Sequence, residues 1–233
     1  MKMRVLHVTA TRKPPRRTKI KINPAGLADI GFVHGAPVIA VPQQDGFDLI
    51  LQGENKASET NENGKLIHVG LHREKPTLTL NFTRNFSSTG LSAGDFLAAR
   101  YEQGIITAKK LPPAQRYYVV SSKNYGAFLQ LSGAWLNDSG FLPGAIITVA
   151  VGLDCITLRL WNDPVATYSD IVKFARMHQY QVIQSQKNQH ITIIDLESYL
   201  LNCAGFDTGD ISGIYYEYGR ITLFRPDLQK LGF

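Results

Sequence analysis

The sequence predicts a mainly β protein with short helices, built as two tandem β-barrels from four β-β-α-β-β repeats. The first observation behind this prediction is a Gly-x-x-x-Gly pair, with an apolar residue after its first glycine, that recurs along the chain. The second is that similar short strands surround every copy. A repeat with this spacing indicates one supersecondary unit used several times. The glycine pairs are Gly31–Gly35, Gly90–Gly94, Gly140–Gly144 and Gly205–Gly209.

Two strands are expected before each glycine pair, because short runs there are rich in β-branched and large apolar residues. The first strands are expected at Val5–Val8, Leu66–Leu71, Tyr117–Val120 and Gln181–Ile183. A polar loop separates them from the second strands, which are expected at Lys19–Ile22, Leu78–Leu80, Phe128–Leu131 and Ile191–Ile194.

A short helix and a β-hairpin complete each unit. The helices are expected at Pro24–Ile30, Thr83–Thr89, Gly133–Ser139 and Leu196–Ala204. The third strands follow the second glycine, at Val38–Val41, Phe96–Tyr101, Ile146–Val151 and Ile211–Tyr216. Turn signals such as Gln44-Asp45-Gly46 come next, and they are typical of hairpins. The closing strands are Leu49–Leu51, Ile105–Thr107, Ile156–Leu160 and Ile221–Phe224.

One unit of about 45 residues cannot bury a sufficient core alone, because so small a domain leaves too much surface exposed. The units are therefore expected to pair, the first with the second and the third with the fourth. This pairing predicts two domains, 1–113 and 114–233, that meet at Pro112-Pro113.

The unit resembles the swapped-hairpin barrel of the SpoVT/AbrB superfamily, in which two β-β-α-β-β copies interleave their hairpins. The third repeat carries the most specific likeness: Leu129–Gly144, with Trp135 and Gly140-Phe141, is similar to the SymE toxin family. The other repeats keep the glycine pair and strand spacing but have no Trp at that position. The resemblance implies two tandem pseudo-dimeric, AbrB-like barrels.

Several large residues are expected in the barrel cores rather than in a ligand site. Trp135 and Leu136 are interpreted as core anchors, and the phenylalanines after the first glycine, Phe32, Phe141 and Phe206, as barrel plugs. Cys155 and Cys203 are expected to be buried free thiols, which suits the reducing cytoplasm of a bacterial cell.

Composition argues against a membrane protein and a metalloprotein. The longest apolar runs fall far short of the 18 residues of a membrane span, and the N-terminus becomes polar too soon for a secretory signal. The six histidines are scattered, and the stretch from His68 to His72 lies mostly on a predicted strand, where four-residue spacing does not converge. No cofactor, metal or membrane partner is expected, and the predicted location is cytoplasmic and nucleoid-associated.

Charge is distributed unevenly between the two halves. Residues 1–113 hold 16 basic against 9 acidic side chains, a net +7, whereas residues 114–233 hold 9 against 10, a net −1. A cationic cluster on one loop and strand is typical of phosphate binding. The resemblance places the loop between the first two strands, and the nearby helix, on a DNA-facing surface. The candidate nucleic-acid-binding residues are Arg12, Lys13, Arg16, Arg17, Lys19, Lys21, Arg73, Lys75 and Arg84.

Two connecting segments differ from the repeats. Gly53–Gly64 is polar and is expected to be a mobile loop. Thr167–Tyr180 has apolar residues near helical spacing and predicts an amphipathic helix. A protein partner could contact this helix or the second barrel.

Three functions are open at this point. The first is a DNA-binding protein, either a regulator or nucleoid-associated, that uses the basic loop of the first barrel. The second, implied by the likeness to SymE, is a toxin that acts on RNA or the nucleoid. The third, implied by the superfamily, is an antitoxin or inhibitor that binds a protein. No catalytic residues are assigned, since the scattered histidines (His7 and His34 besides His68 and His72) form no acid–base pair with a defined spacing. A non-enzymatic role is expected, with DNA as the ligand and RNA as the alternative.

Overall fold

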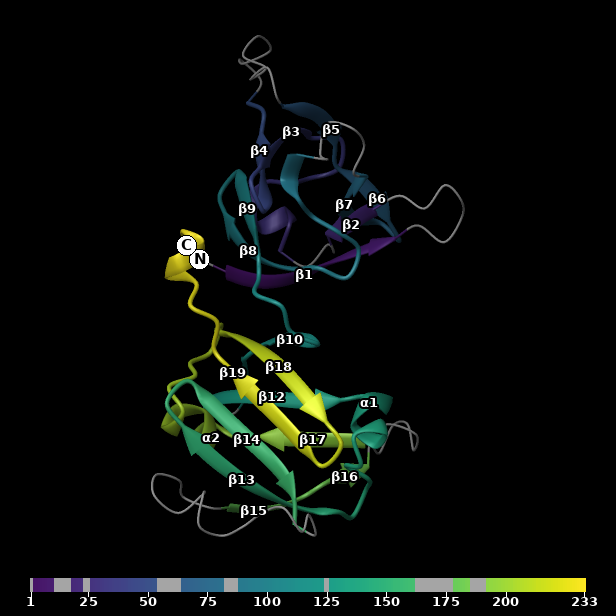
Figure 1. The fold of residues 1–233 in the computed structure, drawn as a ribbon. Coiled ribbons are helices and arrows are strands. Elements are labelled where there is room, and N and C mark those ends of the chain that lie inside the picture. The colour runs from purple at the N-terminus through teal and green to yellow at the C-terminus, as the bar shows by residue number, and fades with distance from the viewer. Residues whose placement is uncertain are drawn as a thin grey trace. The chain divides into compact units, whose positions relative to one another are not determined.

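The computed structural model describes residues 2–10, 18–22, 26–53, 64–81, 88–123, 126–161, 178–184 and 192–233 (Figure 1). The chain divides into two compact units. Unit 1 contains Met1–Pro113 together with the C-terminal residues Asp227–Phe233, and unit 2 contains Ala114–Pro226. Both units consist mainly of β-strands (Figure 1).

Unit 1 holds one strongly bent, nearly closed sheet with the strand order β5-β3-β4-β9-β8-β1-β2-β7-β6. The long strand β1 belongs to both halves of this sheet, pairing with β8 through Lys2–His7 and with β2 through Val8–Ala10. The elements are β1 (Lys2–Ala10), β2 (Thr18–Ile22), η1 (Ala28–Ile30), β3 (Pro37–Gln43), β4 (Gly46–Leu51), β5 (Lys65–His68), β6 (Gly70–His72), β7 (Lys75–Asn81), β8 (Phe96–Glu102) and β9 (Ile105–Lys110).

Unit 2 has the same topology in two sheets, of orders β10-β18-β19-β14-β13-β15 and β11-β12-β17-β16. Its elements are β10 (Arg116–Val119), β11 (Ser121–Lys123), β12 (Gly126–Ser132), α1 (Ala134–Asp138), β13 (Ile146–Gly152), β14 (Cys155–Leu160), β15 (His178–Gln181), β16 (Ile183–Gln184), β17 (Thr192–Leu196), α2 (Ser198–Cys203), β18 (Ile211–Glu217) and β19 (Arg220–Phe224). A last short helix, η3 (Gln229–Leu231), belongs to unit 1. The predicted strands thus overlap observed strands throughout the part of the chain that is described.

The repeats exchange strands within each unit. Repeat 1 contains β1–β4, repeat 2 β5–β9, repeat 3 β10–β14 and repeat 4 β15–β19. The first strand of every repeat pairs with the third strand of its neighbour: β1 with β8, β5 with β3, β10 with β18 and β15 with β13. Neither repeat of a pair can therefore complete its sheet without the other.

A buried valine within β1, or directly after β5, β10 and β15, fixes this exchange. Its carbonyl accepts a hydrogen bond from the second glycine of the neighbouring repeat, and its N–H donates to the residue after that glycine, at 2.8–3.1 Å. The resulting Val–Gly bond pairs are Val8 with Gly94, Val69 with Gly35, Val120 with Gly209 and Val182 with Gly144. The four glycines have φ between 80° and 103°, a region that favours glycine. The glycine repeat therefore marks the points at which neighbouring repeats are joined.

The hairpin turns make a second reciprocal contact. A turn N–H in each repeat donates to the carbonyl of the residue before the first glycine of the other repeat, at 2.8–3.0 Å. The bonds run from Asp45 to Thr89, Gly104 to Ile30, Asp154 to Ala204 and Gly219 to Ser139. The donors all have positive φ. Each unit thus has pseudo-twofold symmetry at the level of individual hydrogen bonds.

The helices are shorter than predicted. The expected Pro24–Ile30 segment contains only the three-residue η1, and α1 and α2 have five and six residues. Most of the expected Thr83–Thr89 helix lies outside the described residues. A buried leucine directly before η1 or within α1 and α2 (Leu27, Leu136 and Leu201) accepts a hydrogen bond through its carbonyl from the N–H of Phe32, Phe141 or Phe206. A single turn is enough to make this contact, so a longer helix is not needed.

The predicted core residues are confirmed. Trp135 is 4% exposed, and Leu136, Phe32, Phe141 and Phe206 are fully buried in the separate cores of the two units. The prediction of two buried cysteines is wrong. Cys203 is exposed and Cys155 half-buried. Side chains alternate along a strand, and the buried Ile156 and Leu158 take the core side of β14.

The predicted Thr167–Tyr180 helix is wrong at its C-terminal end, and its earlier part lies outside the described residues. His178–Gln181 form β15, because the edge of β13 provides backbone partners: Ile147 opposes Tyr180 and Thr148 opposes Gln179. The helical spacing of apolar side chains in the sequence gives no information about that open edge. Most of the predicted Gly53–Gly64 loop also lies outside the described residues.

Candidate nucleic-acid interface

The outer side of β2 and β7 in unit 1 carries adjacent lysines. Strand alternation buries Ile20 and Ile22, so Lys19 and Lys21 face outward. The opposite residues on β7 are Asn81 for Lys19 and Thr79 for Lys21, and both are exposed. Lys19, Lys21, Thr79 and Asn81 are called the basic face below. The two lysine Cα atoms are separated by two residues of strand, about 6.8 Å.

No carboxylate neutralises these lysines within the described part of the chain, where every ion pair involves other residues. Thr79 and Asn81 add a hydroxyl and an amide, groups that donate hydrogen bonds but carry no charge. The basic face can therefore bind an anion with two ammonium groups and two neutral donors.

The β6–β7 hairpin carries two more predicted residues, Arg73 and Lys75, at the edge of the same sheet. His72 and Lys75 are paired, and the two-residue turn between them has φ values of 49° at Arg73 and 63° at Glu74. Such a turn prefers Asn or Gly, so this one is strained. All of these side chains are exposed, and Glu74 offsets part of the positive charge.

The remaining predicted residues are not brought into the described site. Arg12, Lys13, Arg16, Arg17 and Arg84 lie outside the described residues. Residues 11–17 join Ala10 to Thr18, which are register partners on β1 and β2. The predicted basic loop therefore begins and ends on the strands next to Lys19.

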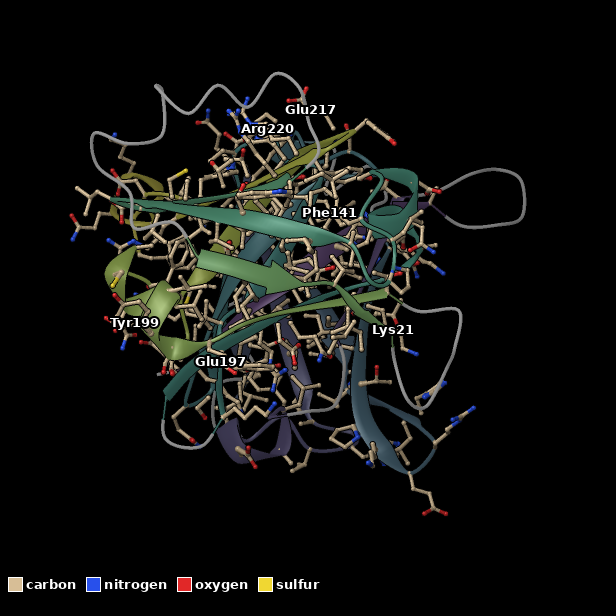
Figure 2. The ribbon with its side chains drawn as sticks, turned by 90° about the horizontal axis from the view of Figure 1, so that it is seen from below. Lys21, Phe141, Glu197, Tyr199, Glu217 and Arg220 are labelled. Carbon is tan, nitrogen blue, oxygen red and sulfur yellow. The ribbon has the colours of Figure 1, made fainter. Side chains whose placement is uncertain are left out.

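The corresponding face of unit 2 has a different character. Gln130 stands where unit 1 has Lys21, and its amide donates to Asp195 Oδ1 at 2.9 Å. Asp195 corresponds to Thr79. Phe128 corresponds to Lys19, and the Lys123 ammonium lies 4.4 Å from the centre of its ring. Glu197 follows β17 and is exposed. Lys21 of unit 1 and Glu197 of unit 2 are both labelled in Figure 2.

Sequence analysis missed a second cationic cluster, formed by Lys2 and Arg4 at one end of unit 1. The Arg4 guanidinium lies 5.7 Å from the centre of the Tyr101 ring. A Cβ on Gly26 would lie 3.5 Å from Lys2 Nζ and 3.7 Å from an Arg4 nitrogen. Burial raises the pKa of Tyr101 to about 12, with the Arg4 charge acting in the opposite direction.

The same Arg–Tyr pair recurs in unit 2, where Arg116 lies 5.9 Å from the Tyr216 ring centre and 5.2 Å from that of Trp135. Trp135 occupies the position that corresponds to Gly26. A pair present in both units is accounted for by barrel packing, so it is not added to the basic face. Its only sequence signal is an Arg four residues before the first of these valines in each unit, Arg4 before Val8 and Arg116 before Val120.

Comparisons with known proteins do not identify a family. No protein-family model matches the chain, and no curated protein matches it. Similar solved structures include the Caulobacter crescentus pol III beta, at 13% identity, 95% coverage of this chain and a TM-score of 0.13, and a Bartonella birtlesii sliding clamp at 8% identity, 97% coverage and a TM-score of 0.10. Likenesses this weak carry no argument. The chain spans 57% and 61% of the length of those two proteins.

Within the described residues, no helix is long and apolar enough to span a membrane. No group of three or more His, Cys, Asp or Glu residues among them is placed to hold a metal ion.

Proposed function

We propose that this protein binds duplex DNA through the basic face of unit 1 and the basic segment 11–17 that connects β1 to β2. The observation that carries the proposal is the outward pair Lys19 and Lys21, which no described carboxylate neutralises. The matching positions of unit 2, Phe128 and Gln130, carry no charge, and Asp195 adds a negative one. Because unit 2 has the same topology, the fold alone does not require lysines at these positions.

The chemistry of the basic face suits a phosphate backbone. Lysines contribute charge and release counterions, whereas Thr79 and Asn81 can donate hydrogen bonds to phosphate oxygens. Arg12, Lys13, Arg16 and Arg17 lie between β1 and β2 in the sequence and add four positive charges there. The concentration of positive charge favours contacts to phosphates, so the proposal is binding through the DNA backbone, as in a nucleoid-associated protein or a regulator.

We further propose that both units are swapped-hairpin barrels of the SpoVT/AbrB type. The exchange of first strands between repeats and the four Val–Gly bond pairs support this assignment. In that architecture the loop between the first two strands belongs to the DNA-binding surface, which agrees with the place of the basic loop in the sequence.

The test is a salt titration of duplex DNA binding with the full chain. If about five phosphates are neutralised, log K falls against log salt with a slope of about −4 to −5. The Lys19→Ala/Lys21→Ala variant is expected to flatten the slope by about 2, since each phosphate contact contributes about 0.9. The same change is expected for Arg16→Ala/Arg17→Ala.

A matched control removes two positive charges elsewhere. Lys123 on β11 of unit 2 and Lys230 on η3 are exposed and neither belongs to the basic face, so Lys123→Ala/Lys230→Ala is expected to keep the native slope. A native slope near zero would refute the proposal. If Lys123→Ala/Lys230→Ala flattened the slope as much as Lys19→Ala/Lys21→Ala, net charge and not the basic face would determine binding.

A further inference from the structure

The outer side of the larger sheet in unit 2 carries a row of aromatic rings. The ring of Phe224 on β19 stacks on Tyr215 of β18, with centroids 5.2 Å apart and an interplanar angle of 17°. It also meets the edge of Tyr117 of β10 at 6.3 Å. Gly213 makes room for this arrangement, because a Cβ there would overlap the Phe224 ring. Tyr215 is 47% exposed, so the row ends in an accessible aromatic surface.

An arginine row lies two residues beyond the Tyr215–Thr222 pair, about 6.8 Å along the strands, and four residues beyond Phe224. Arg159 on β14 is directly opposite Arg220 on β19, and Arg220 is opposite Glu217 on β18. Glu217 Oε1 lies 3.7 Å from Arg220, and no described carboxylate pairs with Arg159. Like charges placed directly opposite in a sheet are destabilising. A bound anion would remove that cost.

A depression of about 540 Å³ reaches from Tyr215 of the aromatic row to Arg220 of the arginine row. Its lining consists of Gln115, Tyr215, Tyr216, Glu217, Arg220 and Thr222. Gln115 accepts a hydrogen bond from the N–H of Tyr216 through its Oε1, which leaves the side-chain NH₂ as a donor beside Tyr215. Glu217 and Arg220, labelled in Figure 2, stand next to each other at the end of the β18–β19 hairpin.

The corresponding surface of unit 1 has neither row. Ile50 and Ile105 occupy the positions of Arg159 and Arg220. Arg100 takes the position of Tyr215, and the ring of Phe233, at the C-terminus of the chain, lies 5.8 Å from its guanidinium. In unit 1, therefore, an aromatic ring of the chain itself stacks at the place where unit 2 has the open depression.

We propose that the outer face of β18, β19 and β14 binds single-stranded nucleic acid. A base stacks on Tyr215, Gln115 donates to the edge of that base, and Arg159 and Arg220 contact phosphates. Unpaired bases are commonly held by aromatic side chains on an open sheet face, with arginines along the backbone. A duplex keeps its bases inside the stack, so they cannot stack on Tyr215. The proposed site belongs to unit 2 and shares no residue with the basic face of unit 1.

The experiment uses the full chain carrying Lys19→Ala/Lys21→Ala, so that the basic face does not mask the second site. Fluorescently labelled dT15 and rU15 are titrated at fixed salt. Tyr215→Ala is expected to weaken binding of both about ten-fold, because loss of one base-stacking ring has roughly this effect. Tyr215→Phe keeps the ring and is expected to bind as before, which also shows that the site still folds.

The matched control is Tyr218→Ala. Tyr218 lies on the turn of the same hairpin and is 79% exposed, but it does not line the depression. Its removal is expected to leave affinity unchanged. The proposal is overturned if the parent binds neither oligonucleotide, if Tyr215→Ala binds like the parent, or if Tyr218→Ala loses as much affinity.

A second measurement tests the arginines. Arg159→Gln/Arg220→Gln is expected to flatten the salt slope for dT15 by about 1.4, since single strands contribute about 0.7 per phosphate. Its melting temperature is expected to stay level or rise, because the opposed like charges are gone. An unchanged slope would overturn the assignment of phosphates to this row. Failure of duplex binding in the native chain would refute the function proposed for unit 1 without affecting these outcomes.

Discussion

The Val–Gly bond pairs give a prediction that separates backbone conformation from packing. Gly94 has φ of 103°, and its N–H donates to the carbonyl of Val8 at 2.8 Å. An added Cβ would have no neighbouring heavy atom within 4 Å. Gly94→Ala therefore introduces no clash, and its cost is that of forcing an L-residue into the left-handed region, about 1–2 kcal/mol. For a unit of this size that corresponds to a fall of roughly 4–8 °C in the melting temperature.

Gly53 provides the control. Its surroundings are equally open, with no heavy atom within 4 Å of an added Cβ, but it lacks a left-handed φ. Gly53→Ala is expected to be neutral or to stabilise by up to about 1 kcal/mol, because alanine restricts the unfolded chain. Both variants are compared by thermal and urea unfolding. If Gly94→Ala melts with the native protein, the Val8–Gly94 geometry does not constrain the fold. A loss above about 4 kcal/mol would show a rearrangement beyond the backbone cost.

Three further predictions concern the stability of unit 1 and the absence of nucleic-acid cleavage. Glu74→Gly is expected to stabilise the chain by about 1 kcal/mol in urea unfolding, because it removes a left-handed glutamate from the β6–β7 turn; destabilisation would contradict this. Tyr101 has its pKa raised to about 12 by burial, so its contribution to stability is full below about pH 10 and is lost as the pH rises towards 12. The Tyr101→Phe variant is expected to show a shallower loss of stability over that interval than the native chain, and equal slopes would refute the assignment. Labelled RNA and DNA incubated with the protein, with and without Mg²⁺, are expected to remain intact; cleavage that His68→Ala/His72→Ala abolishes would favour the nucleic-acid toxin instead.

The strands and the core could be predicted from sequence because they depend on local pattern. Ile20 and Ile22 alternate with Lys19 and Lys21, and that alternation alone assigns the buried side and the charged side of β2. The same rule, applied to Ile156 and Leu158, would have placed Cys155 on the outer side. That error came from treating cysteine as a core residue by type rather than by position in the strand.

Features that depend on pairing between distant strands could not be predicted. The partner of Gly94 is Val8, and it becomes apparent only when β1 is known to lie beside β8. The arginine row likewise requires the register that sets Arg159 opposite Arg220, more than sixty residues apart in the chain. His178–Gln181 form a strand because β13 offers a free edge, and the local helical spacing carries no information about that edge.

The two units differ at their outward positions far more than at the positions that hold the repeats together. All four Val–Gly bond pairs are present, and the Arg–Tyr pair occurs once in each unit. On the outer faces, by contrast, Lys21 is matched by Gln130 and Ile50 by Arg159. Residues that only maintain a barrel have no reason to exchange a lysine for an amide on one sheet and an isoleucine for an arginine on the other. The exchanges place outward-facing lysines in unit 1 and an arginine row beside the exposed Tyr215 in unit 2. This division is expected if one barrel binds the backbone of duplex DNA and the other binds unpaired bases.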